Sequence, residues 1–318
     1  MQMQLFSGTA NPELAQHMAD ALAMELGDVG ISRFPDGEIF VKFVQNIRGA
    51  DVFIVQPTCT PPNETLMELL IMLDAARRAS AQRITAVLPF FGYARQDRKD
   101  QARVPITAKL VANLLVTAGA SRVLTMDLHS QQIQGFFDIP VDHLHASSVL
   151  VKHLLETVDD SAVVVAPDSG GVKMAHAYAS MMNAGLAIVA KHRIDADRVA
   201  ALHLVGDVEG RDCVLVDDLT TTAGTLIAAA EQLRKSGAKR IFAAVSHCPL
   251  TPEGHQRLTD SCITALVTTD SVPIRPGQVF SDKVKVLSIA GLLAEAVRRI
   301  HEGRSISSLF NVDVGSVR

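Results

Sequence analysis

The sequence predicts an α/β fold in which mainly parallel sheets are flanked by helices. Short apolar, β-rich runs recur along the chain, and each is followed by a turn and a helix-length amphipathic stretch. Apolar strands that alternate with helices are typical of parallel sheets covered on both faces. The length of 318 residues is about twice that of a typical domain of roughly 150 residues, so two domains are expected.

The expected strands are apolar runs rich in valine, isoleucine and leucine that begin after a turn. They lie at residues 51–56, 83–89, 122–128, 162–166, 186–190, 213–217, 240–245 and 263–268. The helices that are easiest to recognise have proline near the start or glycine near the end, since proline favours the first turn of a helix and glycine favours its termination. We expect them at residues 62–80, 105–119 and 224–236.

An internal repeat relates residues 48–87 to residues 209–245. Both segments have a strand, a polar turn, a Thr-Leu pair, a helix and then an Arg-Ile pair that opens a second strand. This similarity predicts a duplicated α/β domain, with the boundary near residues 141–148. After its first strand, the first copy has Gln56-Pro57 where the second has Asp217-Asp218, so only the second keeps a carboxylate pair there.

Composition and charge exclude several classes of protein. With 48% apolar and 20% charged residues the chain is neither disordered nor fibrous, and its net charge of −4 argues against a nucleic-acid partner. We see no basic start followed by an apolar stretch and no apolar run of about 18 residues, so neither a secretory signal nor a membrane span is expected. The four cysteines form no CxxC pair, which favours buried thiols in a reducing cytoplasm (Cys59, Cys213, Cys248 and Cys262).

The strongest local motif is VLVDDLTTTAGT at residues 214–225. An apolar strand delivers Asp217 and Asp218 into a turn of small residues that opens a helix, and ligands of open α/β sheets bind at such strand ends. Backbone N–H groups there can hold a phosphate, while the carboxylates can accept hydrogen bonds from sugar hydroxyls. The structural alternative is an ordinary turn with a threonine N-cap. Neither GxxxxGK[ST] nor GxGxxG occurs, so a P-loop kinase or a Rossmann dehydrogenase loses its main support.

Five further segments could carry chemistry. FFGYARQDR at residues 90–98 combines aromatic rings with guanidinium groups that could stack on a base and hold phosphates, or it is a solvated charged loop. FPDGE at residues 34–38 is a turn by composition. Strand-end His129 and Asp168 would suit Mg²⁺, or they are a satisfied polar histidine and a helix cap. Lys191 to Arg193 are basic residues on an expected loop, either solvated or able to close over transferring phosphoryl groups.

Taken together, the ordered set of motifs resembles the ribose-phosphate pyrophosphokinase family of class I over nearly the whole chain. The motifs, in chain order, are FSGTANPELA, RFPDGE, DVFIVQPTC, NETLMELLIMLDAARRAS, RITAVLPFFGYARQDRK, PITAKLVANLL, GASRVLTMDLHSQQIQGFFDIPVD, VVAPDSGGV, GDVEG, VDDLTTTAGT and KVKVLSIAGLLAEAVRRIHEGRSISSLF. The resemblance implies two duplicated type I phosphoribosyltransferase-like domains, residues 1–145 and 146–318, with the tail packing back on the first domain.

The resemblance also implies an activity: transfer of the β,γ-diphosphoryl group of ATP to the 1-hydroxyl of ribose 5-phosphate, with release of AMP. By resemblance, the turn of one subunit would recognise the adenine of ATP bound to a neighbouring subunit, through Phe34, Asp36, Gly37 and Glu38. The nucleotide itself would be held by Arg95, Gln96 and Asp97. His129 and Asp168 would hold Mg²⁺, and Lys191 and Arg193 would be the catalytic cations. Ribose 5-phosphate would be bound by Arg193, Asp217, Asp218, Thr221, Thr222, Ala223, Gly224 and Thr225.

Two departures and two alternatives accompany this resemblance. The family usually has aspartate where Thr221 stands, and residues 101–104 replace a more charged segment, so regulation by ADP and phosphate is expected only weakly. A homohexamer built from dimers is expected. A phosphoribosyltransferase would use the same loop at residues 214–225, and a catalytically silent regulatory subunit would only assemble with active enzyme. Release of AMP from ATP and ribose 5-phosphate separates these alternatives.

Overall fold

The structure, a computed structural model, describes residues 1–195, 198–274 and 281–310, with the backbone alone for residues 191–195, 198–202 and 310. The chain divides into two compact units. The first contains Met1–His145, Ser271–Pro273 and Ser288–Phe310, and the second contains the described parts of Ala146–Asp270 and Ile274–Leu287. The C-terminal segment therefore returns to the first unit, and residues 146–318 do not form one continuous unit.

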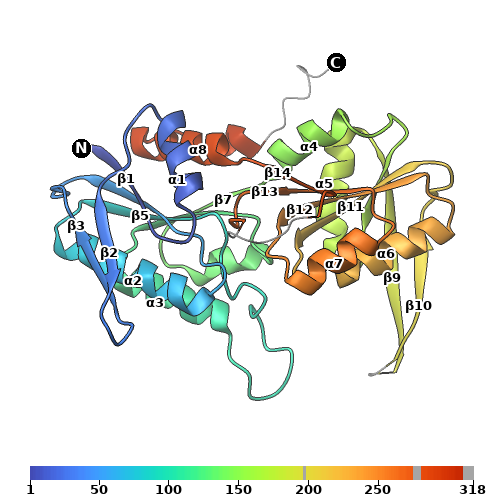
Figure 1. Cartoon of the computed structure of the whole chain (residues 1–318), viewed down its shortest axis with the longest axis horizontal. Helices are drawn as coiled ribbons and strands as arrows, with labels where there is room; N and C mark the ends of the chain where they lie inside the picture. The colour runs from blue at the N-terminus through green and yellow to red at the C-terminus, as the bar shows by residue number, and fades with distance from the viewer. Residues whose placement is uncertain (196–197, 275–280, 311–318) are drawn as a thin grey trace. The chain divides into compact units, whose positions relative to one another are not determined.

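The first unit is built on a five-stranded sheet in the order β1-β4-β5-β6-β7, with every neighbouring pair parallel (Figure 1). Its strands are β1 (Met3–Ser7), β4 (Asp51–Val55), β5 (Arg83–Leu88), β6 (Arg122–Met126) and β7 (Val141–Leu144). Strand β4 is buried at every position, as expected for a central strand covered on both faces. The predicted strands at residues 51–56, 83–89 and 122–128 are confirmed to within two residues.

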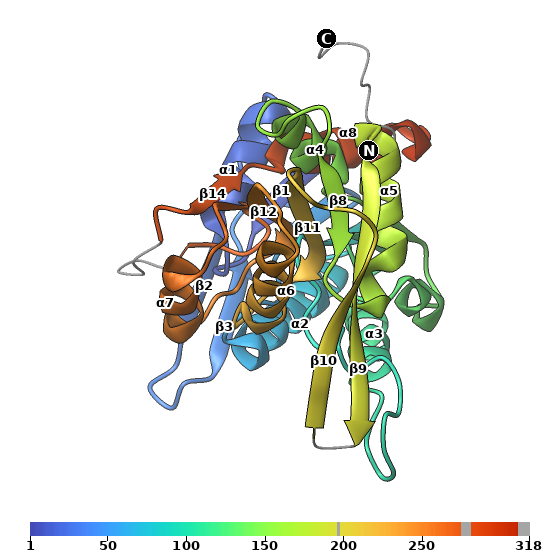
Figure 2. The same cartoon turned by 90° about the vertical axis from the view of Figure 1, so that its right-hand side faces the viewer.

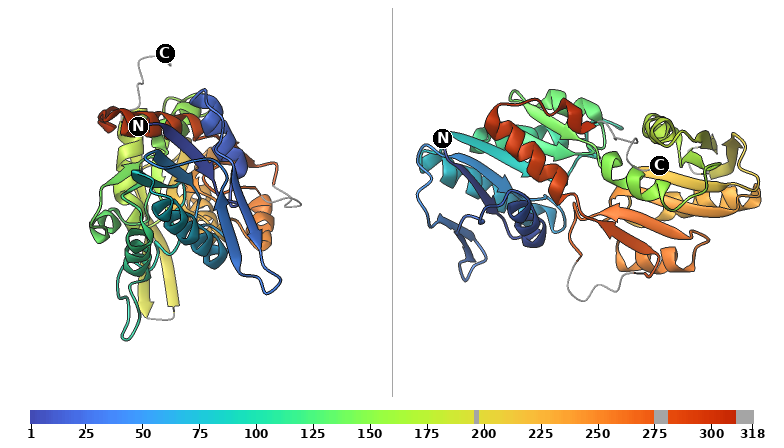
Figure 3. Two further views of the ribbon diagram at one scale, coloured as in Figure 1. Left: turned by 90° about the vertical axis from the view of Figure 1, so that its left-hand side faces the viewer. Right: turned by 90° about the horizontal axis from the view of Figure 1, so that it is seen from above.

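Helices cover this sheet because each has one apolar stripe. They are α1 (Pro12–Ala21), α2 (Pro62–Arg78), α3 (Thr107–Ala118) and α8 (Ala290–Glu302), with the short 3₁₀ helices η1 (Gln131–Phe136) and η3 (Ser307–Phe310). In α2 the buried residues Leu69, Met72, Leu73 and Ala76 follow helical spacing and join the core of this unit. Helix α8 packs against α1 beside the first sheet (Figure 3).

A separate antiparallel hairpin, β2 (Val29–Arg33) and β3 (Ile39–Phe43), packs against α2. Residues 34–38 form its turn, as composition predicted, and Gly37 has a φ of +95°, which favours glycine.

The second unit contains a seven-stranded sheet in the order β10-β9-β8-β11-β12-β13-β14. All neighbours are parallel except β9 and β10. The strands are β8 (Val163–Ala166), β9 (Gly185–Asp195), β10 (Arg198–Val205), β11 (Asp212–Leu219), β12 (Arg240–His247), β13 (Ala265–Thr269) and β14 (Val284–Leu287). The helices are α4 (Ser147–Leu155), η2 (Ser169–Gly171), α5 (Val172–Met182), α6 (Gly224–Lys235) and α7 (Pro252–Asp260).

Strand β9 corrects one expectation. The loop expected at residues 191–193 is wrong, because β9 continues to Asp195. It pairs with β8 over its first four residues and runs on beyond that stretch beside β10, as Figure 2 shows. The mostly polar residues at 191–195 give no apolar pattern from which a strand could be predicted. They form a strand because their backbone groups pair with those of the neighbouring strand β10.

The internal repeat is confirmed as two βαβ units, β4-α2-β5 and β11-α6-β12. In each unit the first residue of one strand is the register partner of the first residue of the next, Asp51 with Arg83 and Asp212 with Arg240. Both aspartates have fully buried side chains, and each carboxylate accepts two hydrogen bonds from its arginine. The duplication therefore preserves a buried ion pair at the amino ends of the strands.

Candidate active site

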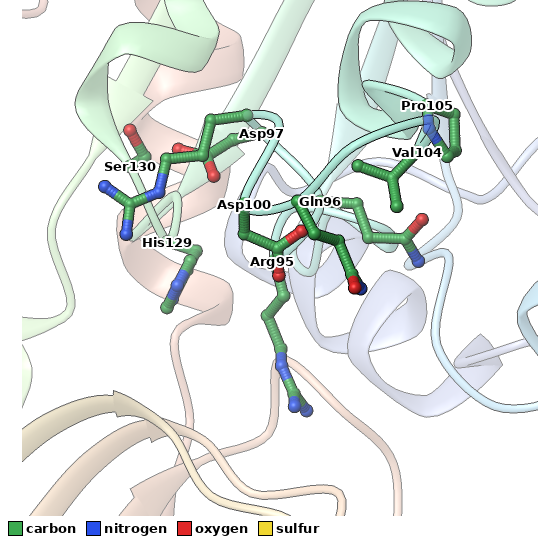
Figure 4. A pocket seen from close by; sticks show the side chains of 10 residues that line it. Arg95, Gln96, Asp97, Asp100, Val104, Pro105, His129 and Ser130 are labelled. Carbon is green, nitrogen blue, oxygen red and sulfur yellow. The ribbon is translucent and has the colours of Figure 1, made fainter. Parts of the chain in front are cut away.

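The carboxyl ends of the parallel strands carry the polar residues singled out in the sequence, one group in each unit. In the first unit a cavity of about 500 Å³ opens beside the segments that follow β5 and β6. It is lined by Arg95, Gln96, Asp97, Arg98, Asp100, Gln101, Val104, Pro105, His129 and Ser130. In Figure 4, His129 and Ser130 lie on one side of the cavity, and Val104 and Pro105 lie on the other. The structure thus brings Arg95, Gln96 and Asp97 together with His129.

Close packing fixes the loop that carries Arg95. The Gly92 N–H donates to Thr58 Oγ1 over 2.7 Å, and a Cβ atom at Gly92 would lie 2.4 Å from the Thr58 carbonyl oxygen. Phe91 is 3% exposed and packs edge-on against Phe137, with ring centroids 6.0 Å apart. Phe91 therefore anchors the loop in the core, and the idea that it could stack on a base is wrong.

His129 is exposed two residues after Asp127, at the end of β6. Asp127 is buried, and its Oδ1 lies 2.9 Å from Nδ1 of His145, which follows β7. This hydrogen bond raises the pKa of His145 above its usual value, although partial burial opposes the shift. Asp127, His143 and His145 each have a ligand-type atom within 4.8 Å of the others. Sequence analysis missed both histidines, and the only signal was the His-Leu-His spacing at residues 143–145, in a segment where no strand was expected.

The turn at residues 34–38 is an exposed part of the same unit. Phe34 is 51% exposed and meets Phe40 edge-on at 5.8 Å between ring centroids. The turn closes through a hydrogen bond from the Phe34 N–H to the Glu38 carbonyl, and the Glu38 N–H donates to Asp36 Oδ1. Phe34 thus presents an aromatic face on a closed turn, which suits stacking on a flat ring.

In the second unit, Asp217 and Asp218 are part of β11, and the turn is limited to residues 220–223. Ala223 occupies the N-cap position of α6 in the left-handed region, with a φ of 56°, and no side chain caps the helix in the described part of the chain. The threonine N-cap considered as the structural alternative is therefore wrong. Helix α7 packs closely against the turn at Gly254. A Cβ atom at this position would lie only 2.7 Å from the Thr221 carbonyl oxygen. An uncapped helix N-terminus of this kind offers N–H groups and a positive dipole end to an anion.

Three carboxylates of this unit influence one another. Asp168 follows β8, and its Oδ1 accepts hydrogen bonds from the Gly170 N–H at 2.9 Å and the Gly171 N–H at 3.3 Å, which orient the carboxylate. Burial, followed by the charge of Asp218 and more weakly that of Asp168, raises the pKa of Asp217 to about 8. Neighbouring parallel strands β8 and β11 thus bring like charges together without a cation among the described residues to offset the effect on Asp217.

Replacement of this carboxylate has an expected effect on stability. We expect Asp217→Asn to raise the melting temperature of the ligand-free protein at pH 8 and to weaken ribose 5-phosphate binding. The folded protein holds the Asp217 proton up to about pH 8, whereas the unfolded chain loses it near 3.8. Wild-type stability therefore falls as pH rises between these values, while the asparagine does not titrate.

Thermal unfolding of both proteins from pH 5 to pH 9 measures this difference. The gain in melting temperature should be largest at pH 8 and above and should shrink toward pH 5. A gain that is independent of pH, or largest at pH 5, contradicts the raised pKa.

Lys191 and Arg193 have backbone positions two residues apart in β9, and their side chains lie outside the described residues. Arg98, one of the two guanidinium groups of the segment 90–98, also lines the cavity. Asp100 and Gln101 line it too, although sequence reasoning did not assign them to the site, because they were visible only as part of a charged run that a solvated loop shares.

Duplicated parallel-sheet units with polar residues at their strand ends place the chain in the class of α/β proteins that bind ligands at the carboxyl ends of parallel strands. A family model described as the N-terminal domain of ribose phosphate pyrophosphokinase matches residues 3–119, and one described as a phosphoribosyl synthetase-associated domain matches residues 192–311. Ribose-phosphate pyrophosphokinase of Pasteurella multocida is 50% identical over 311 residues, covering 97% of this chain and 99% of that protein. The Vibrio parahaemolyticus enzyme of the same name is 51% identical over 311 residues, covering 97% of this chain and 99% of that protein.

Among solved structures, phosphoribosylpyrophosphate synthetase from Mycobacterium smegmatis matches with a TM-score of 0.90 and 43% identity, covering 95% of this chain and all of that chain. The chain belongs to the ribose-phosphate pyrophosphokinase family. It is an enzyme of that family, and the predicted fold class is confirmed. A phosphoribosyltransferase and a silent regulatory subunit are not favoured. No helix in the described ranges is long and apolar enough to span a bilayer.

Proposed function

We propose that this chain transfers the β,γ-diphosphoryl group of ATP to the 1-hydroxyl of ribose 5-phosphate, giving 5-phosphoribosyl 1-diphosphate and AMP. Membership of the family supports the reaction. The observation that carries the assignment of the acceptor site is the strand-end acidic pair Asp217-Asp218 followed by the uncapped N-terminus of α6. This arrangement offers acceptors for sugar hydroxyls and donors for a phosphate within a few residues of each other.

Ribose 5-phosphate is assigned to the turn at residues 221–225. Backbone N–H groups at the start of α6 donate to the 5-phosphate, and the hydroxyls of Thr221, Thr222 and Thr225 add further donors. Asp217 orients the ribose, with Asp218 beside it, and Arg193 contributes a cation to the same substrate. Bound Mg²⁺ and the nearby cation of Arg193 would also offset the repulsion that raises the pKa of Asp217.

ATP is assigned to the first unit. Arg95, Gln96 and Asp97 line its cavity, where a guanidinium can hold phosphate oxygens with two hydrogen bonds. The exposed turn at residues 34–38, with Phe34 stacking on adenine and Asp36, Gly37 and Glu38 beside it, serves the nucleotide of a neighbouring subunit. A homo-oligomer follows from this assignment, and we propose a hexamer built from dimers, with ADP and phosphate as weak regulators.

Mg²⁺ is the proposed metal ion, held by His129 and Asp168 with the ATP phosphates. Each residue by itself is a type that can hold this ion, since Mg²⁺ takes one or two protein ligands together with phosphates and water. The Asp168 carboxylate is oriented by two backbone N–H groups, and His129 is an exposed imidazole at the rim of the cavity. When bound, Mg²⁺ would neutralise charge on the phosphates. Lys191 and Arg193 supply further positive charge as the bond to the departing AMP breaks.

The three buried cysteines support a reducing location. Cys59, Cys213 and Cys248 are buried as thiols, and burial raises the pKa of Cys213 and Cys248 to about 12. Such thiols are unreactive, so we propose that the enzyme works in the cytoplasm.

A coupled assay for AMP tests the proposed reaction. AMP should form only when ATP, ribose 5-phosphate and Mg²⁺ are all present, and the product should carry the diphosphate on C1. Release of diphosphate from 5-phosphoribosyl 1-diphosphate and a purine or pyrimidine base, without AMP formation from ATP, would instead identify a phosphoribosyltransferase. Absence of both reactions in the purified chain would support the silent subunit.

Loss of the proposed metal ligand gives a further expected result. His129→Ala should raise the KM for Mg-ATP at least about tenfold, by analogy with the loss of groups that support a metal site, while the KM for ribose 5-phosphate changes less than about twofold. Initial rates measured over a range of Mg²⁺ concentrations check this. His176→Ala, at an exposed position of α5, is the matched control. A defect that Mg²⁺ concentration does not influence removes His129 from the metal site.

A further inference from the structure

The corner between β6 and η1 is held by three hydrogen bonds from the end of β7. The Asp127 N–H donates to the Leu144 carbonyl over 3.0 Å, and the Leu128 N–H donates to His143 Nε2 over 2.9 Å. The third is the 2.9 Å contact of His145 Nδ1 with Asp127 Oδ1. These contacts fix the two residues that directly precede His129.

The backbone of this corner needs such support. Asp127 has a φ of +35°, in the left-handed region that a non-glycine residue adopts only when its surroundings hold it there. His143 is 7% exposed and Asp127 is 5% exposed, so the hydrogen bonds that each makes in this corner are shielded from water. A buried Leu128 N–H without its acceptor would be costly, because a desolvated donor is more expensive to leave unpaired than a bond is favourable to form.

We propose that His143 and His145 are positioning residues, which hold the Asp127–Leu128 corner so that His129 presents its imidazole to the cavity and to the metal-bound nucleotide. The proposal rests on the proposed role of His129. His143 acts through its neutral ring, whose Nε2 lone pair accepts the Leu128 N–H, and His145 acts by donating from Nδ1 to the Asp127 carboxylate.

A metal ion held by Asp127, His143 and His145 themselves is the competing explanation for the cluster. It is less favoured, because the His143 Nε2 lone pair is already engaged with the Leu128 N–H, and the His143 Nδ1 lies 3.2 Å from the Gln134 side-chain amide. Whichever ring nitrogen bound a metal would first have to leave its present partner.

The test compares substitutions that keep one hydrogen-bonding atom with substitutions that remove it. His143→Gln keeps an acceptor near the position of Nε2, and His143→Leu removes it. His145→Asn keeps a donor near Nδ1, and His145→Ala removes it. We expect the Leu and Ala variants to raise the KM for Mg-ATP about tenfold, with less than a twofold change in the KM for ribose 5-phosphate. The Gln and Asn variants should restore most of the Mg-ATP affinity.

Amide hydrogen exchange in the enzyme without nucleotide gives a readout that does not depend on activity. The Leu128 amide should exchange at least about tenfold faster in His143→Leu than in His143→Gln. Equal exchange in the two variants, or equal effects on both KM values, overturns the positioning role. If His143→Leu does not fold, the His145 pair still decides the question by the same KM comparison.

Two controls separate the possible failures. If His129→Ala leaves the KM for Mg-ATP unchanged while Leu128 exchange responds as expected, the proposed role of His129 fails and the corner contacts stand as structural alone. Calorimetric titration of the wild-type enzyme with Zn²⁺ and with Mn²⁺, each without nucleotide, tests the competing metal site. Binding that is lost in both His143→Gln and His145→Asn overturns the positioning proposal in favour of a metal site.

Discussion

Lys191→Ala and Arg193→Ala should each lower kcat about 100-fold or more while leaving the KM for ATP nearly unchanged. A cation that engages charge as it develops on the departing AMP contributes little to binding of the ground state, so its loss affects kcat. The size follows from the loss of a single electrostatic donor in other active sites, which costs about 10²- to 10³-fold. Steady-state kinetics with each substrate varied in turn measures both constants.

The residue between these two positions is the matched control. His192 lies in the same stretch of β9 and carries no assigned role, so His192→Ala should change kcat by less than about threefold. A rise in the KM for ATP with kcat unchanged in either cation variant would mean that the residue binds the ground state. An equally large loss of kcat in His192→Ala would mean that the strand tolerates no change, and would remove the evidence for specific cations.

Asp212→Ala should destabilise the second unit by about 1–3 kcal/mol, because it removes a buried carboxylate that accepts hydrogen bonds from Arg240 and from the Asp159 backbone N–H. The Asp212 side chain is fully buried and accepts from Arg240 Nε at 3.0 Å and from the Asp159 backbone N–H at 3.1 Å. The repeated pair in the first unit predicts a loss of similar size for Asp51→Ala. Urea denaturation followed by circular dichroism measures the loss, since the chain has no tryptophan to report by fluorescence.

An exposed ion pair in the same unit is the control for this effect. Asp207 contacts Arg211 at 3.2 Å, but its side chain is 70% exposed, so Asp207→Ala should cost less than about 1 kcal/mol. Equal destabilisation by Asp212→Ala and Asp207→Ala would show that burial does not distinguish the two pairs. In that case the conserved arrangement of the two βαβ units would contribute little to stability.

The central strands could be predicted because each contains a continuous apolar run. Strands β4, β5, β6, β8, β11 and β12 begin within one residue of the expected positions, since a strand buried on both faces needs apolar residues on both of its faces. The hairpin β2–β3 was not predicted, because none of its residues is buried and its longest apolar run, Ile39–Val41, has only three residues. Strand β10 and the outer part of β9 were not predicted either, because their strand structure depends on pairing with each other and not on a local apolar pattern.

The sequence by itself determined the α/β class, the repeat and the motif at residues 214–225, because these depend on local patterns of apolar and small residues. Only the tertiary structure decided which side chains share an environment. It brings Asp168 from β8 to the acidic pair of β11, and it sets His143 and His145 against the corner that precedes His129. The order of strands in a sheet joins residues that are far apart in the chain, and local periodicity reports the burial of a segment but not the identity of its neighbour.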